Sequence, residues 1–251
     1  MNQLDTKKIA FITGGNRGIG LETARQLGQI GIFPVIGARS AAAGKEAVAI
    51  LKREGIEADS LEFDLSSKPH QQKVYDYFAA RTGQLDILIN NAGVYLEGEP
   101  SVVDLYSTST VPENVLRDTL EANFLAPVAL TQKLLPLLRK SPAGRIVNLS
   151  SILASLTLHS DPQSPIYGSV AVAYNTSKTA LNSYTVHLAK ELRDSTVKIN
   201  SAHPGWVQTS MGGRVAPMNV VDGAKTSVRL ATLPADGPNG GFFHLGETLP
   251  W

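Results

Sequence analysis

The chain has 251 residues, enough for one large α/β domain with a sizeable core, and no shift in composition marks a second domain. Its 23 basic and 22 acidic residues leave a net charge of +1, which argues against a surface that binds nucleic acid. Because there is no cysteine and the histidines are scattered, we expect no disulfide, no thiolate catalysis and no metal site. The N-terminus lacks an apolar signal segment and no apolar run approaches membrane-spanning length, so we expect a cytoplasmic protein without a membrane partner.

Short apolar runs alternate with helical patterns along the whole chain. The runs predict strands at 8–13, 32–38, 60–64, 85–90, 144–150, 197–202 and 241–245. Helical patterns lie at 19–30, 41–53, 69–81, 112–139, 173–193 and 222–230. The runs are almost continuously apolar, which is typical of parallel strands covered on both faces. The sequence therefore predicts an α/β fold, a doubly wound Rossmann-type parallel sheet of about seven strands with helices on both faces.

Irregular segments follow the carboxyl ends of three predicted strands. They lie at 94–111, 152–172 and 205–221. Ligands of open α/β sheets bind at this edge, so we expect these loops to form the substrate pocket of a single nucleotide-binding domain, 1–251. In the long fourth helix, Pro127 and Pro136 predict a kink or a break.

A glycine-rich turn, Thr13-Gly-Gly-Asn-Arg-Gly-Ile-Gly20, joins the first strand to the first helix. Unpaired N–H groups at a helix N-terminus attract a pyrophosphate, and glycines let the backbone approach it. The glycines at 14, 18 and 20 do not follow the G-x-G-x-x-G spacing, so an ordinary strand–helix joint stays open as the alternative.

The second strand ends in Ala38-Arg39, where NAD-binding folds usually place an acidic residue. Together with Arg17, Arg39 suits the 2′-phosphate of NADP, although both arginines could simply be solvated. Asp64 is a candidate for the adenine amino group, or else a helix cap or turn residue. Asn90-Asn91-Ala92-Gly93 would let the chain pass close to a flat ligand, or form only a turn.

Tyr174 and Lys178 carry the strongest indication of chemistry. Residues four apart lie on one helix face, and a lysine ammonium beside a phenol favours the phenolate. We therefore expect a tyrosine whose pKa is lowered towards working pH, able to exchange a proton with a substrate oxygen. A solvated helix pair is the alternative.

Two further polar residues could complete the site. Ser151 ends the fifth strand at the ligand edge, where a hydroxyl can bond a substrate oxygen, with Ser150 as a minor rival. Asn123 lies in the long helix near Pro127. The alternatives are a strand-end cap for Ser151 and, for Asn123, a residue that satisfies carbonyls freed at the kink.

Taken together, these motifs resemble the short-chain dehydrogenase/reductase family over nearly the whole chain, and most of all its NADPH-dependent carbonyl reductases. The resemblance implies an Asn123–Ser151–Tyr174–Lys178 tetrad, in which Tyr174 is the acid/base, Ser151 orients the carbonyl, Lys178 lowers the tyrosine pKa and holds the nicotinamide ribose, and Asn123 supports a water in a proton relay. Implied cofactor-binding residues are Gly14, Asn16, Arg17, Gly18, Ile19, Gly20, Arg39, Asp64, Leu65, Asn91, Ala92, Gly93, Tyr174, Lys178, Pro204, Gly205, Val207 and Thr209. Of these, Val207 and Thr209 would contact the carboxamide.

We therefore expect an NADP(H)-dependent enzyme that reduces a small-molecule aldehyde or ketone with Tyr174 as general acid. An alcohol or hydroxysteroid dehydrogenase working in the oxidative direction is the enzyme alternative, and a catalytically silent dinucleotide sensor is the alternative of another class. Family members commonly form homodimers or homotetramers, which we expect through helices 112–139 and 173–193. Candidate residues of an apolar pocket are Tyr95, Leu96, Leu153, Trp206 and Met211.

The connection between Ser151 and Tyr174 departs from the family pattern. At 23 residues (174 − 151) it is longer than in most short members. It is shorter than the large insertion of monomeric animal carbonyl reductases, and it borders the expected pocket. Substrate size and oligomeric state therefore depend on this segment.

Overall fold

The computed structural model describes residues 7–98 and 106–251. Its strands form one sheet in the order β3-β2-β1-β4-β5-β6-β7-β8, and all pairs are parallel except β7 with β8. The strands are β1 (Ile9–Thr13), β2 (Phe33–Ala38), β3 (Asp59–Glu62), β4 (Ile87–Asn90), β5 (Arg145–Leu149), β6 (Lys198–Ala202), β7 (Phe242–His244) and β8 (Glu247–Thr248). The predicted doubly wound sheet is confirmed. The count of seven strands was one short, because β8 has only two residues and no apolar run.

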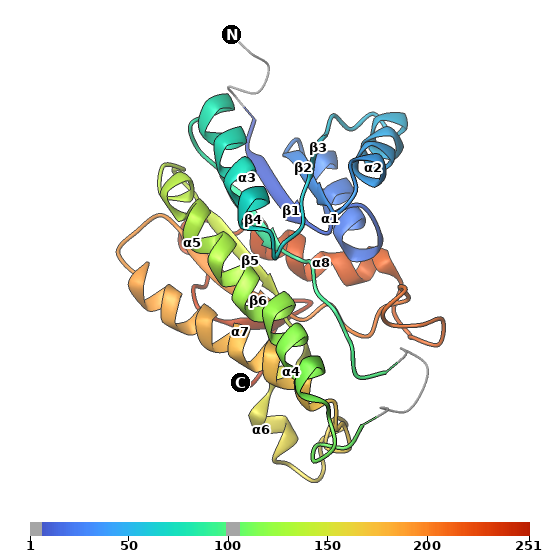
Figure 1. The fold of residues 1–251 in the computed structure, drawn as a ribbon. Coiled ribbons are helices and arrows are strands. Elements are labelled where there is room, and N and C mark those ends of the chain that lie inside the picture. Colours follow the sequence, from blue (N-terminus) through green and yellow to red (C-terminus); the bar gives the residue numbers. More distant parts are fainter. Residues whose placement is uncertain (1–6, 99–105) are drawn as a thin grey trace.

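Strand β1 shows why the sheet needs helices on both faces. Successive side chains of a strand point to opposite faces, and in β1 every residue is buried. Ile9 and Phe11 join one core cluster, with residues of α3, α5 and α7, while Ala10 and Ile12 join a second, with residues of α1, α2 and α8. Figure 1 shows these two helix layers on either side of the sheet. The Phe11 ring makes edge contacts with Phe63 and Phe78 at 5.3 and 5.8 Å between centroids.

The helices follow the predicted order. They are α1 (Gly18–Gln29), α2 (Ala41–Arg53), α3 (Lys68–Arg81), α4 (Glu113–Leu120), α5 (Ala126–Leu138), α6 (Leu156–His159), α7 (Val172–Glu191) and α8 (Val220–Ala231). Short α6 and the 3-10 turn η2 (Ile152–Ala154) lie in a segment predicted to be irregular. Among the helices of the described ranges, none is long and apolar enough to cross a membrane.

The long helix is interrupted as predicted, but not by a kink at either proline. A π-helical turn, η1 (Glu121–Leu125), separates α4 from α5, and Pro127 occupies the first turn of α5, while Pro136 lies inside that helix. Pro127 has no N–H to donate to the carbonyl four residues earlier, which belongs to Asn123. The widened turn therefore forms where the regular hydrogen-bond ladder is already broken.

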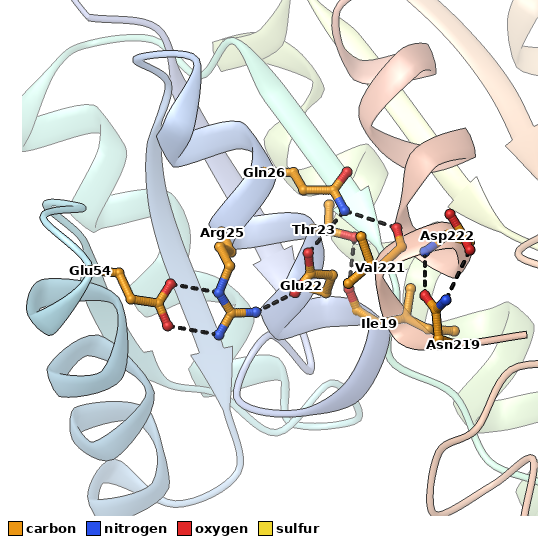
Figure 2. A network of polar contacts seen from close by, with 9 residues as sticks. All are labelled: Ile19, Glu22, Thr23, Arg25, Gln26, Glu54, Asn219, Val221 and Asp222. Atoms are coloured by element: carbon orange, nitrogen blue, oxygen red, sulfur yellow. Dashed lines mark hydrogen bonds and ion pairs between the residues drawn. The ribbon is translucent and has the colours of Figure 1, made fainter.

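Helix α1, which begins at the glycine turn, is fixed to α2 and α8 by a polar network (Figure 2). Arg25 donates to both carboxylate oxygens of Glu54 at the end of α2, at 2.6 and 3.1 Å, and pairs with Glu22. Gln26 bridges Glu22 and the carbonyl of Val221 in α8, each at 2.9 Å. These contacts hold α1 on both sides along its length.

Candidate active site

The backbone of the glycine turn has conformations and close contacts that require glycine. Gly14 and Gly18 have φ values of +63° and +53°, a region that other residues avoid. A Cβ at Gly20 would lie 2.5 Å from the carbonyl oxygen of Gly14, so only glycine fits there. The turn therefore brings helix α1 up against the preceding backbone and the Asn91 amide, with no room for a side chain at position 20.

The turn is joined to the end of strand β4 through Thr13. The Thr13 hydroxyl accepts hydrogen bonds from the backbone N–H groups of Asn91 and Ala92, at 3.0 and 2.9 Å. The Asn91 amide donates back to the carbonyl oxygens of Thr13 and Gly14, at 2.8 and 3.2 Å. The predicted Asn-Asn-Ala-Gly motif thus fixes the glycine turn in place, at the point where the strand order reverses between β1 and β4.

The N-terminus of α1 suits an anion. Its N-cap residue is Arg17, no side chain caps the helix, and no acidic residue lies in its first turn. Strands β1 and β2 pair with Thr13 opposite Gly37, so Arg17 and Arg39 both follow the carboxyl ends of neighbouring strands, and both are exposed. Within the described part of the chain neither arginine pairs with a carboxylate. The residues present therefore fit a dinucleotide with a further phosphate.

Asp64 forms a turn after β3. Its Oδ1 accepts from the backbone N–H and hydroxyl of Ser66, at 3.1 and 2.8 Å, while Ser67 caps helix α3. Both Asp64 and Leu65 are half-buried just past the end of β3. Asp64 therefore has the turn role named as one alternative, and its contact with adenine stays a prediction.

The segment after β6 reaches the glycine turn. A Cβ on Gly18 would lie 3.4 Å from the Thr209 methyl carbon, so the two motifs meet across the site. Gly205, after Pro204, has a φ of +88°, and Val207 is buried and forms an isolated bridge with Met218. The position of Thr209 is consistent with its predicted role near the cofactor.

Tyr174, Ser151 and Lys178 lie together at the carboxyl ends of β5 and the start of α7. The Ser151 hydroxyl is hydrogen-bonded to Tyr174, and it also accepts from the N–H of Leu153 at 3.2 Å. The Lys178 ammonium lies 5.8 Å from the centre of the Tyr174 ring and donates to the carbonyl of Leu149 at 2.8 Å. Lys178 is only 5% exposed, so the alternative of a solvated helix pair is wrong.

Burial dominates the electrostatics of this group. It raises the pKa of Tyr174 to about 12, against a smaller lowering by the hydrogen bond from Ser151. It also lowers the pKa of Lys178 to about 8. The prediction that Lys178 lowers the pKa of Tyr174 below its ordinary value is thus wrong. The physical reason is that both groups are desolvated, and the ammonium is directed at Leu149 rather than at the phenol oxygen.

Asn123 is fully buried in η1, and its side chain does not bind the freed carbonyls that were named as the alternative. Its Oδ1 accepts from the N–H of Val94 at 2.8 Å, and its Nδ2 donates to the carbonyl of Val94 at 2.9 Å and to the Ser177 hydroxyl at 3.0 Å. It therefore fixes the chain after β4 rather than the carbonyls freed by Pro127. Its role beside a relay water stays a prediction.

The sequence did not predict two residues that support the site, Glu97 and His203. Glu97 is 1% exposed and accepts from the N–H groups of Ala173 and Tyr174. His203 accepts from the N–H groups of Ile152 and Gly205, and burial lowers its pKa to about 3, so it is neutral. His203 directly precedes the Pro-Gly pair, a signal in the sequence. Nothing in the sequence shows that the acid at 97 is buried.

A half-buried phenol at the sheet edge that carries the glycine turn suits hydride transfer between a nicotinamide and a carbonyl or alcohol, which needs a proton donor. The fold and site together define a nucleotide-dependent oxidoreductase. The model of the short chain dehydrogenase family matches residues 8–219, and the chain belongs to that family, as its sequence predicted.

Similar proteins match this chain over nearly the whole length of both partners. Salutaridine reductase of Papaver bracteatum is 31% identical, over 98% of this chain and 97% of its own. "Carbonyl reductase [NADPH] 1" of Rattus norvegicus is 29% identical, over 98% and 99%. The solved structure of the carbonyl reductase Sniffer of D. melanogaster superposes with a TM-score of 0.81 at 30% identity, over 98% and 99%. The first alignment spans 303 positions, more than the 251 residues of this chain, so the Papaver protein carries segments that this chain lacks.

Proposed function

We propose that this NADP(H)-dependent oxidoreductase reduces an aldehyde or ketone, with Tyr174 as the general acid. The reaction adds a hydride, which the bound cofactor supplies, to the carbonyl carbon, and a proton to the carbonyl oxygen. The observation that carries the proposal is the contact of half-buried Tyr174 with Ser151 and with buried Lys178, at the same sheet edge as the glycine turn.

Each residue of this group has a distinct part. With a pKa of about 12, Tyr174 keeps its proton at neutral pH and can give it to the carbonyl oxygen. The Ser151 hydroxyl lies against the phenol and can turn its single proton to the carbonyl oxygen as charge develops there. Lys178, held by Leu149, places a positive charge beside the phenolate that forms. Asn123 fixes the backbone that follows the Asn-Asn-Ala-Gly motif.

The cofactor would lie along the carboxyl edge of the sheet. The first turn of α1 would hold the pyrophosphate, and Arg17 and Arg39 the 2′-phosphate, since two exposed cations without an acidic neighbour favour that group. Thr209 and Val207 would contact the nicotinamide end. The relative from Rattus norvegicus, whose name includes NADPH, supports a preference for the phosphorylated cofactor.

The side chains proposed to face the substrate are apolar. Leu96, Trp206 and Met211 are 41%, 54% and 38% exposed on the substrate loops, and the Tyr95 ring lies 5.3 Å from that of Tyr174. Exposed apolar side chains on the segments proposed to surround Tyr174 suit a bulky apolar carbonyl compound. Oxidation of the corresponding alcohol is the reverse of the same reaction.

The replacement of Tyr174 by Phe tests the proposal, because it removes the proton donor and keeps the ring. We expect kcat for NADPH-dependent carbonyl reduction to fall by about a thousandfold or more, while the Kd for NADPH, measured by nucleotide fluorescence, changes little. Tyr184→Phe makes the same change ten residues further along α7, in the core, and should keep activity. Undiminished turnover by the Tyr174 variant would make the assignment wrong. A wild-type protein that binds NADPH and reduces no carbonyl compound in a broad screen would support the sensor alternative.

We further propose that the protein is cytoplasmic and assembles as a homodimer or homotetramer through the helices of residues 112–139 and 173–193. Leu125 supports the second point, since this leucine between α4 and α5 is 50% exposed. Light scattering after size exclusion measures the assembly, and a monomer would contradict it.

A further inference from the structure

A buried carboxylate caps the helix that carries the proposed proton donor. Both oxygens of Glu97 accept backbone hydrogen bonds, from Ala173 at 2.9 Å and from Tyr174 at 2.7 Å. Helix α7 starts at Val172, and its own N-cap residue, Ala171, offers no side-chain acceptor. Glu97 comes from a distant segment and supplies the negative charge that a helix N-terminus favours. A carboxylate that is 1% exposed carries a desolvation cost, and these charge-assisted bonds offset it.

The same short segment touches the site at two more points. Val94 is held by Asn123 through both its N–H and its carbonyl. The Tyr95 ring lies 5.3 Å from the Tyr174 ring, at an angle of 59°. Residues 94–97 therefore run alongside the start of α7, which they contact through a ring and a carboxylate, and the backbone of Val94 is clamped to η1.

The position of Tyr174 depends on the first turn of α7. Tyr174 is the third residue of the helix, where N–H groups have no partner within the helix and the turn frays readily. Lys178 lies one turn later and is fixed independently by the carbonyl of Leu149. If the first turn loosened, Tyr174 would move relative to Ser151 and Lys178, while the rest of α7 stayed in place.

We propose that Glu97 is a positioning residue for carbonyl reduction. It holds the first turn of α7, and through it the Tyr174 hydroxyl, in register with Ser151. It contacts the Tyr174 backbone and acts through it. This inference rests on the proposed function.

The replacement of Glu97 by Gln tests the role with little change of shape. The amide keeps one acceptor oxygen and turns an NH₂ group towards the other backbone N–H. We expect kcat to fall about tenfold or more, since a displaced proton donor weakens the chemical step, while the Kd for NADPH stays within about twofold. Glu113→Gln, which removes an exposed acid from the first turn of α4, is the matched control and should keep kcat.

Hydrogen exchange gives a measure that does not depend on turnover. The amides of Ala173 and Tyr174 should exchange faster in Glu97→Gln than in the wild-type protein, and amides after Lys178 should not. A kcat within about twofold of wild type would overturn the proposal, whatever the exchange rates. Equal losses of kcat and NADPH binding would also overturn it, because they indicate a general structural role. If the wild-type protein reduces no carbonyl compound, the proposed function is wrong. Unchanged hydrogen exchange at Ala173 and Tyr174 in Glu97→Gln would separately refute the capping contact.

Discussion

Tyr174 and Lys178 are neighbours whose pKa values burial moves in opposite directions. Burial favours the uncharged form of each group, so it raises the pKa of the phenol to about 12 and lowers that of the ammonium to about 8. The sequence spacing could predict that the two side chains share a helix face. It could not predict the pKa of the phenol, because the desolvation comes from distant segments that cover the start of α7.

The lowered pKa of Lys178 makes the free energy of unfolding depend on pH. A lysine whose pKa falls on folding from about 10.4 to about 8 binds fewer protons in the folded than in the unfolded state between these values, so the free energy of unfolding rises with pH in that window. Lys178→Met, which keeps the length without the charge, should lack this rise. Between about pH 7.5 and about pH 9.5 the wild-type protein should therefore gain about 2 kcal/mol relative to the variant.

Urea unfolding of both proteins without cofactor, at each pH, measures this difference. Tyr174 does not interfere, because its raised pKa costs stability only as pH rises from about 10 towards 12. If the wild-type and variant curves ran parallel across the window, Lys178 would not be desolvated as described.

At the scale of elements, the interruption between α4 and α5 places Asn123. The prolines in the sequence predicted an interruption, and the missing N–H of Pro127 explains its position. The partner of the asparagine could not be predicted, since Val94 lies 29 residues earlier in the chain. The short elements α6 and β8 were not predicted, because they have too few residues to show a hydrophobic period. The longer apolar runs and helices were predicted to within a few residues.

Replacing Asn123 by Ala, compared with Ser177→Ala, tests how much stability the contacts of Asn123 with Val94 contribute. The variant loses both bonds to Val94 and leaves two backbone groups without their partner, so we expect about 2 to 3 kcal/mol less stability in urea unfolding. Ser177→Ala removes the third contact, together with the bond from the Ser177 hydroxyl to the carbonyl of Tyr174, and should cost about 1 kcal/mol. Equal losses in the two variants would contradict the role assigned to Asn123.

For the whole molecule, the sheet brings segments from all parts of the chain to one edge. The glycine turn, the Asn-Asn-Ala-Gly motif, Ser151 and Pro204-Gly205 each directly follow a strand, β1, β4, β5 and β6, and these four strands are adjacent. Parallel strands end at the same edge, so the order of motifs in the sequence sufficed to predict this convergence. Contacts between loops, such as those of Glu97, required the structure.

Cofactor binding should stabilise the whole fold by mass action. A ligand at about 100 times its Kd adds about 2.7 kcal/mol, which for a chain of this size raises Tm by about 5 to 10 °C. We expect NADPH to give a larger rise than NADH at the same concentration. Arg39→Asp should remove the difference, and Arg53→Asp, at the exposed far end of α2, should keep it. Differential scanning fluorimetry measures all three proteins, and a persistent preference in Arg39→Asp would contradict the 2′-phosphate assignment.

The fixed base of the segment predicted to be the first substrate loop has a consequence for protein engineering. Because residues 94–97 are joined to η1 and α7 by backbone and carboxylate contacts, they separate the catalytic helix from changes made after Gly98. Foreign sequences could be grafted beyond that glycine to redirect substrate preference without re-optimising the proton donor. Libraries that keep Val94 to Glu97 and randomise beyond them should therefore yield more active clones than libraries that start at Val94.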